Sequence, residues 1–128
     1  MPATNFESTF DDAFGDKDWA KTARADPKVA MEIKATIGAV AATLATGSNL
    51  RGKAKDFPVP FYAIHGRGDT RTSCEVMEEF VDNIGPSKAS MDAIETTGHQ
   101  LFQDKPEIVQ DVFNKITNWI LKNVKEMK

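Results

Sequence analysis

The stretch from Val59 to Ile94 constrains the fold most, because its pattern changes from strand to helix and back to strand within one short region. Val59 to His65 is an apolar and aromatic run that ends before Gly66, which is typical of a buried strand. A second strand near a sheet edge is predicted from Ala89 to Ile94, where Ala89, Met91 and Ala93 alternate with Ser90, Asp92 and Ile94. Between them, a helical apolar face ends at Gly85 and consists of Val76, Met77, Phe80, Val81 and Ile84.

A helix that joins two neighbouring strands makes them parallel, with a right-handed crossover. We therefore predict an α/β fold whose last two parallel strands are flanked by helices. Residues 56–128 form its C-terminal βαβα part, and residues 1–55 form a separate helical segment. Two short parallel strands leave both edges unpaired, so the chain is expected to be the tail of a longer α/β protein or a piece that depends on a partner.

The first 55 residues predict helices only. Asp16 is placed to cap a helix that ends at the Asp26-Pro27 pair, because the residue before a proline avoids the helical region. A second helix runs to Gly47, with the alternative that it resumes through Leu50, and its apolar stripe consists of Ile33, Ile37, Val40 and Leu44. An aromatic stripe at four-residue spacing precedes both and consists of Phe6, Phe10 and Phe14.

Two capping boxes are predicted in the second half of the chain. Thr72 with Glu75 marks the start of the crossover helix, and Asp104 with Glu107 marks the start of the last helix. The last helix keeps one apolar face, which consists of Ile108, Val112, Ile116, Trp119, Ile120 and Val124.

Charge and cysteine content exclude several classes of partner. A net charge of −3 argues against nucleic acid and acidic membranes, because both require clustered Lys and Arg. Cys74 is the only cysteine, so no internal disulfide forms and a reducing compartment, the cytoplasm, is expected. No membrane span is predicted, since the most apolar stretch, Ile37 to Ala45, is far shorter than the roughly 20 residues of a span. No signal peptide, metal or cofactor is predicted either.

Two chemically active residues follow the predicted strands closely, Asp69 after the first and His99 after the second. Because catalytic groups collect at the carboxyl ends of parallel strands, we expect these side chains to meet. A carboxylate that orients an imidazole suits acyl transfer from a serine, since the imidazole takes up and returns the serine proton near neutral pH. The order acid, then histidine, is also that of α/β-hydrolases, in which the serine precedes both.

Three segments resemble the terminal strands and helix of monoacylglycerol-lipase-like α/β-hydrolases: Pro60 to Asp69, Gly98 to Glu107, and Asn118 to Ile120. The resemblance covers residues 56–125 well, and residues 16–55 are similar, less specifically, to the lid-exit helices of that family. It implies that Asp69 is the triad acid and His99 the triad base. It also implies that residues 1–55 are the remainder of a lid or cap, and that the complete enzyme acts on acylglycerols or other small acyl esters.

The chain departs from that family in one large respect, because the nucleophile elbow GxSxG is absent. We therefore predict the C-terminal part of a serine ester hydrolase, inactive alone. The alternative is a non-catalytic hydrolase remnant that binds a partner through its unpaired sheet edge, either the missing N-terminal half or another chain. A smaller departure is the Thr97-Gly98 pair directly before His99, where the family has its glycine two or three residues earlier.

Simpler interpretations stay open for individual residues. Asp69 is also a good turn former, and His99 alone would be an ordinary loop histidine. His65 is expected to be structural, the Arg67-Gly68-Asp69 adhesion tripeptide to be a chance match, and Cys74 to be an inert thiol. The aromatic residues that fit either a lid over an acyl chain or a helix packed on the core are Phe6, Phe10, Phe14 and Trp19.

Overall fold

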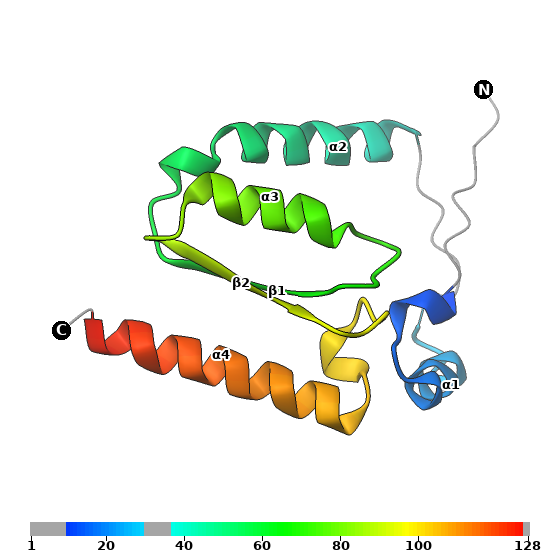
Figure 1. Cartoon of the computed structure of the whole chain (residues 1–128). Coiled ribbons are helices and arrows are strands. Elements are labelled where there is room, and N and C mark those ends of the chain that lie inside the picture. Colours follow the sequence, from blue (N-terminus) through cyan, green and yellow to red (C-terminus); the bar gives the residue numbers. More distant parts are fainter. Residues whose placement is uncertain (1–9, 30–36, 127–128) are drawn as a thin grey trace.

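The computed structural model describes residues 10–29 and 37–126 of the chain (Figure 1). These residues form α1 (Lys17–Ala25), α2 (Ile37–Gly52), β1 (Phe61–Gly66), α3 (Cys74–Ile84), β2 (Ala89–Ile94) and α4 (Pro106–Glu126). Short 3₁₀ turns cover Phe10–Ala13, Ala54–Asp56 and Leu101–Gln103. The chain is therefore α/β, with the order of elements that the sequence predicts.

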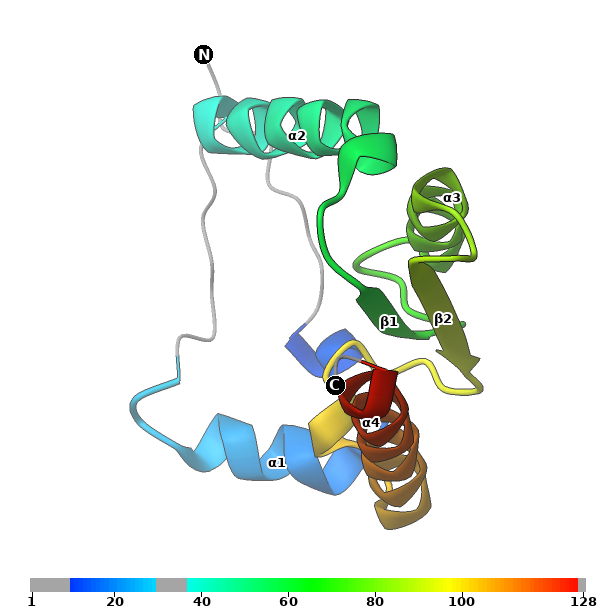
Figure 2. The ribbon, with the colours of Figure 1, turned by 90° about the vertical axis from the view of Figure 1, so that its left-hand side faces the viewer.

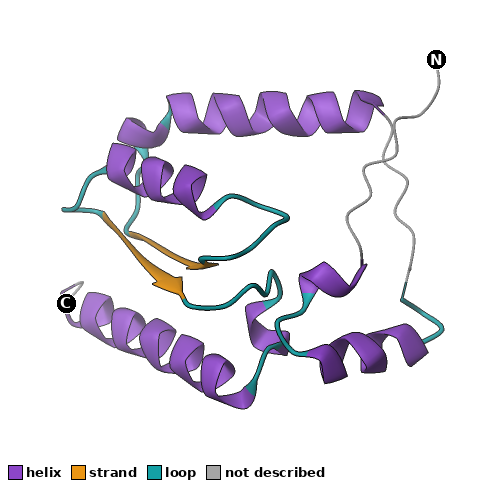
Figure 3. Cartoon of the chain, turned by 45° about the vertical axis from the view of Figure 1, so that its right-hand side comes forward, coloured by secondary structure: helices purple, strands orange, loops and turns teal. Residues whose placement is uncertain are grey.

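The two strands are parallel and run side by side from the Phe61–Ala89 pair to the Gly66–Ile94 pair. α3 connects them and lies on one face of the sheet, and α4 lies on the other (Figures 1 and 3). The predicted crossover and the predicted bounds of β2 are confirmed. β1 begins at Phe61 and not at Val59, because its partner β2 begins at Ala89, directly opposite Phe61.

The core lies between α3 and the sheet. Phe80 is buried in α3, and the centroid of its ring lies 6.1 Å from that of Phe57 and 5.7 Å from that of Phe61, both edge-on. Edge-to-face pairs of this kind contribute about 0.5–1.5 kcal/mol beyond burial. The remaining buried members are Ala54, Ala63, Val81, Ile84 and Ala89. This packing fixes β1, β2 and their crossover as one unit.

The opposite face of the sheet packs on α4. The ring of Tyr62 stacks on Trp119 at a centroid distance of 5.4 Å, and its hydroxyl donates to Asp92, which also accepts from Lys115. Burial and the Asp92 carboxylate raise the pKa of the Tyr62 phenol, so it stays a neutral donor. The predicted apolar face of α4 is confirmed only in part: Val112 is buried, and Ile108, Ile116 and Trp119 are half-buried, whereas Ile120 and Val124 are exposed.

The predicted cap of α3 is wrong by one residue. Ser73, and not Thr72, caps the helix: its hydroxyl accepts from the Val76 N–H at 3.2 Å and donates to Glu75. Both hydroxyls have the same local chemistry, and the loop before α3 turns Thr72 toward Asp69. At its other end, α3 stops at Gly85 as predicted, with a φ of 99° that favours glycine.

Asp104 does not cap α4 in the predicted way. Its side chain is buried; Oδ1 accepts from the Lys105 N–H at 2.7 Å, and Oδ2 accepts from the Thr96 hydroxyl. α4 begins at Pro106, a residue favoured at the first helical position because the N–H that it lacks would be unpaired there. Asp104 therefore ties the start of α4 to the loop that follows β2.

The N-terminal elements follow the prediction in part. α1 is capped by Asp16, whose carboxylate accepts from the Asp18 N–H at 2.8 Å, and it ends before the Asp26-Pro27 pair. Phe6 lies outside the described residues. Phe10 and Phe14 belong to a 3₁₀ turn and the residue after it, so the predicted α-helical stripe is wrong there, although the ring centroids lie 5.3 Å apart.

α2 is a helix, as predicted, but its apolar stripe has no surface to pack on among the described residues. Leu44 is 69% exposed and Val40 is half-buried, while Ile33 lies outside the described residues. The helix continues through Gly47 to Gly52, which agrees with the predicted alternative that it resumes through Leu50. Figure 2 shows α2 well apart from α1 and α4, and its C-terminal end leads toward β1.

The outer edge of β1 is unpaired among the described residues. Phe61 donates its N–H to Lys88 and Arg67 donates to Ile94, so these groups point toward β2. Backbone groups alternate in direction along a strand, and those of Tyr62 and Ile64 therefore face the open side. The expectation of further strands stays a prediction.

Candidate functional site

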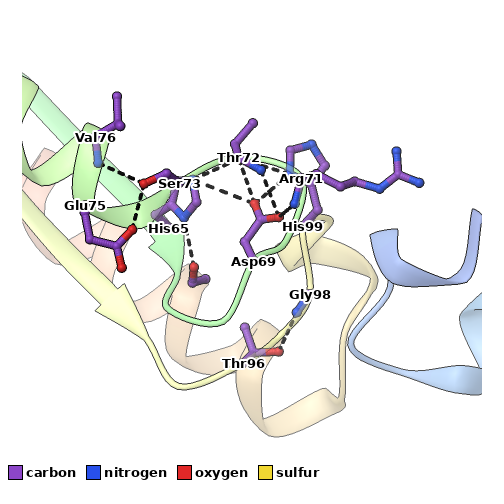
Figure 4. Close-up of polar contacts among 11 residues, drawn as sticks. His65, Asp69, Arg71, Thr72, Ser73, Glu75, Val76, Thr96, Gly98 and His99 are labelled. Carbon is purple, nitrogen blue, oxygen red and sulfur yellow. Dashed lines mark hydrogen bonds and ion pairs between the residues drawn. The ribbon is translucent and has the colours of Figure 1, made fainter. Parts of the chain in front are cut away.

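Asp69 and His99 meet at the carboxyl ends of the two strands, as predicted. Nδ1 of His99 lies 2.8 Å from Oδ2 of Asp69 (Figure 4). Asp69 belongs to the loop after β1 and His99 to the loop after β2, and the parallel pairing brings both strand ends to one rim of the sheet. The two residues that the sequence singled out thus form one polar pair.

The Asp69 carboxylate is buried and fully occupied by donors. Its side chain is 2% exposed, Oδ1 accepts from the Arg71 N–H at 2.7 Å, and Oδ2 accepts from the Thr72 hydroxyl at 2.7 Å as well as from His99. Burial raises the pKa of this carboxyl, but the hydrogen bonds from His99, Thr72 and Arg71 outweigh it and lower the pKa to about 2. Asp69 is therefore a carboxylate at neutral pH.

His99 combines one committed nitrogen with one free nitrogen. A carboxylate only accepts hydrogen bonds, so Nδ1 carries the hydrogen that points at Asp69. In a neutral ring Nε2 is then an unprotonated acceptor, and no hydrogen-bond partner for it occurs in the described part of the chain. The His99 side chain is 35% exposed, so this nitrogen is within reach of a ligand or another segment.

The backbone of the histidine loop is held by a segment from the other end of the chain. The carbonyl of Ala13 accepts two hydrogen bonds, from the His99 N–H at 3.0 Å and from the Gln100 N–H at 2.8 Å. Ala13 is buried with Phe14 and Ala20 in a small apolar cluster. The N-terminal segment thus fixes the backbone position of His99.

Glycines allow this close approach. A Cβ on Gly15 would lie 2.1 Å from Oδ2 of Asp104, and a Cβ on Gly98 would lie 2.5 Å from the same atom. Gly98 also donates its N–H to the Thr96 hydroxyl at 3.0 Å (Figure 4). Gly98 belongs to a segment that resembles the hydrolase family, and packing alone also requires a glycine there, because any side chain would displace the buried Asp104 carboxylate.

Two polar side chains of the site were missed from the sequence. The sequence predicts Thr72 as a helix cap and His65 as a structural residue. In the structure both nitrogens of His65 have partners: Nδ1 lies 2.9 Å from the Gly66 carbonyl and Nε2 lies 3.0 Å from the Thr72 hydroxyl. The one signal that could have linked His65 to the pair is its position near the end of β1, directly before the loop that carries Asp69.

Both residues of the pair line a groove of about 770 Å³, together with Phe61, Ile64 and His65 of β1. Leu44 and Leu50 of α2 line one side, and Phe61 and Met77 lie on the side of the sheet and α3. Asp69, Thr72 and His99 line the same groove. Apolar side chains and an unpaired strand edge thus lead to the free nitrogen of His99.

The hydroxyl groups near the pair are not placed as nucleophiles. Ser73 lines the groove, but its hydroxyl is committed to Val76 and Glu75 as a helix cap. The Thr72 hydroxyl lies 3.4 Å from Nδ1 of His99, the nitrogen that faces Asp69 and not the free one. Among the described residues, the arrangement thus orients an imidazole but places no hydroxyl on its free nitrogen.

Comparison with known proteins gives no family for the chain: no protein-family model matches it, and no match was found among curated proteins. Among residues 10–29 and 37–126, no three His, Cys, Asp or Glu side chains are grouped so that they could hold a metal ion. None of the helices in these ranges combines the length and apolarity that a membrane crossing requires.

Proposed function

We propose that this chain is the C-terminal part of a serine ester hydrolase and supplies the acid, Asp69, and the base, His99, of a catalytic triad. The observation that carries the proposal is the 2.8 Å contact between Nδ1 of His99 and a buried Asp69, with Nε2 left free. The resemblance of the strand ends to monoacylglycerol-lipase-like hydrolases adds the substrate class, an acylglycerol or other small acyl ester. The free cysteine, Cys74, suits a reducing compartment such as the cytoplasm.

In this proposal a serine on another segment attacks the ester carbonyl while Nε2 of His99 takes its proton. The ring becomes an imidazolium, which the Asp69 carboxylate stabilises without taking the proton itself. His99 then returns the proton to the leaving alkoxide, and water repeats the cycle on the acyl-enzyme. The low pKa of Asp69, about 2, keeps the carboxylate charged through these steps.

The segment that carries the serine would add to the sheet. The groove beside β1 has the features that a strand requires, namely outward-facing backbone groups at Tyr62 and Ile64 and apolar side chains around them. A strand in that place would end near His99, because parallel strands end at one rim. This accounts for an oriented base with no hydroxyl on its free nitrogen.

The first test is the size of the cellular protein, captured with an antibody against α4. A product of roughly twice this length or more is expected, as an extra half of ordinary domain size requires. In that product His99→Ala should lower ester turnover by about 10⁴-fold or more. Gln100→Ala is the matched control, since only its backbone N–H is used in the site. Retained turnover in His99→Ala would refute the assignment.

The second candidate is a non-catalytic module that binds a partner through the open edge of β1. It is favoured by the absence of GxSxG and by the exposed apolar side chains of the groove, Leu44 and Leu50 among them. A captured product of 14.1 kDa that fails to react with a serine-directed fluorophosphonate would favour this candidate. A sharp, cooperative melt of the isolated chain as a monomer would contradict its dependence on a partner.

A further inference from the structure

His65 belongs to the same polar network as the Asp69–His99 pair. Its side chain is 10% exposed, and its Nε2 lies 3.7 Å from Oδ2 of Asp69. The Thr72 hydroxyl lies between the two groups, 3.0 Å from Nε2 of His65 and 2.7 Å from Oδ2 of Asp69 (Figure 4). Neither His65 nor Thr72 has a place in the proposed mechanism.

The hydrogens of the network can be counted. The Gly66 carbonyl only accepts, so Nδ1 of His65 must carry a hydrogen. In the neutral ring Nε2 is then an acceptor, whereas in the charged ring it is a donor. The Thr72 hydroxyl has one hydrogen for two neighbours, Nε2 of His65 and Oδ2 of Asp69.

We propose that Thr72 and His65 are positioning residues that couple the protonation of His65 to the Asp69–His99 pair. When His65 is neutral, the Thr72 hydrogen is shared between Nε2 of His65 and Oδ2 of Asp69. When Nε2 binds a proton from solvent, it donates to Thr72, and the hydroxyl must rotate its single hydrogen onto Asp69. Oδ2 of Asp69 then accepts one full hydrogen bond from Thr72 and one from His99. The bond from Nδ1 of His99 to this atom therefore changes in strength.

This inference rests on the proposed function, in which Asp69 and His99 are the acid and the base. It gives the complete enzyme a second histidine that sets how strongly Asp69 holds His99. Glu75 in the first turn of α3 also faces His65; the hydrogen bond with Ser73 does most to lower the pKa of the Glu75 carboxyl, and His65 contributes less. Glu75 is bonded to Ser73 and not to the network, so Thr72 is the only hydrogen-bonded link among the described residues.

The isolated chain allows a direct test by NMR, because it contains two histidines only. The ring signals of ¹⁵N-labelled protein are assigned with His65→Asn and followed against pH. We expect the signal of Nδ1–H of His99 to show a step that coincides with protonation of His65. The step should be lost in Thr72→Val, which removes the hydroxyl, and kept in Thr72→Ser, which retains it.

A merely structural Thr72 would not move this step, and His65→Asn provides an independent variant. Its amide keeps the bond to Gly66 and removes the group at Nε2, so the step should be lost there too. The proposal is overturned if the wild type has no step, or if Thr72→Val keeps it. Absence of any carboxylate-bonded Nδ1–H signal from His99 would instead contradict the pair itself, and with it the proposed function.

Discussion

α2 and α3 both carry apolar side chains and lie on either side of β1 in the sequence, yet only α3 is packed. α3 buries Cys74, Phe80, Val81 and Ile84. No α2 side chain whose exposure is described is buried. The difference is the neighbouring surface, because α3 lies on the sheet and α2 faces the groove at its open edge. An apolar stripe therefore predicts a helix, but a second surface decides whether that helix contributes to stability.

The largest effect is expected in α3. Phe80→Ala should lower the free energy of unfolding by about 3–5 kcal/mol, because it removes a buried ring from contact with Phe57 and Phe61. Urea denaturation followed by circular dichroism measures this loss. Phe113→Ala in α4 deletes the same side chain at a 53% exposed position and should cost less than about 1 kcal/mol. Equal losses would show that α3 is no better packed than an exposed helix face.

A smaller, pH-dependent effect is expected at Asp69, which is buried in the loop between β1 and the packed helix α3. Its pKa is lowered from 3.8 to about 2, so its stabilising effect is complete above the ordinary value and is lost as the pH falls from there toward 2. The effect is at most about 2 kcal/mol. Urea midpoints at pH 6 and at low pH should therefore converge for wild type and Asp69→Asn. Asp82→Asn, exposed on α3, is the control, and a constant gap at both pH values would contradict the shift.

The smallest effect is expected in α2. Leu44→Ala should change the free energy of unfolding of the isolated chain by less than about 0.5 kcal/mol, because this side chain is largely exposed. The same substitution in a longer product should cost more if an added strand covers the groove. A loss of about 2 kcal/mol or more in the isolated chain would show that α2 is packed and would remove the contrast with α3.

The parts of the fold that could be predicted have local signals. The alternation from Ala89 to Ile94 matches β2 residue for residue, and Gly85 ends α3 with a positive φ that other residues rarely adopt. The contact between Asp69 and His99 followed from topology, since parallel strands place their carboxyl ends together.

The parts that could not be predicted depend on tertiary contacts. The local signal favours Thr72 as the cap, because Glu75 follows it by three residues, and only the approach of Asp69 and His65 turns its hydroxyl away from the helix. The carbonyl of Ala13 is a backbone group, so no residue type marks it as the acceptor for the histidine loop. The exposure of α2 depends on what lies across the groove, which its own sequence does not encode.

The double hydrogen bond to Ala13 joins two segments that are made at different times during synthesis. A ribosome makes the chain from its N-terminus, so the Ala13 carbonyl exists well before the N–H groups of His99 and Gln100 that it binds. Asp69, the acid, also precedes His99 along the chain. The histidine loop is therefore the last of these three parts to be made, so its backbone bonds to Ala13 and its pairing with Asp69 form late in synthesis.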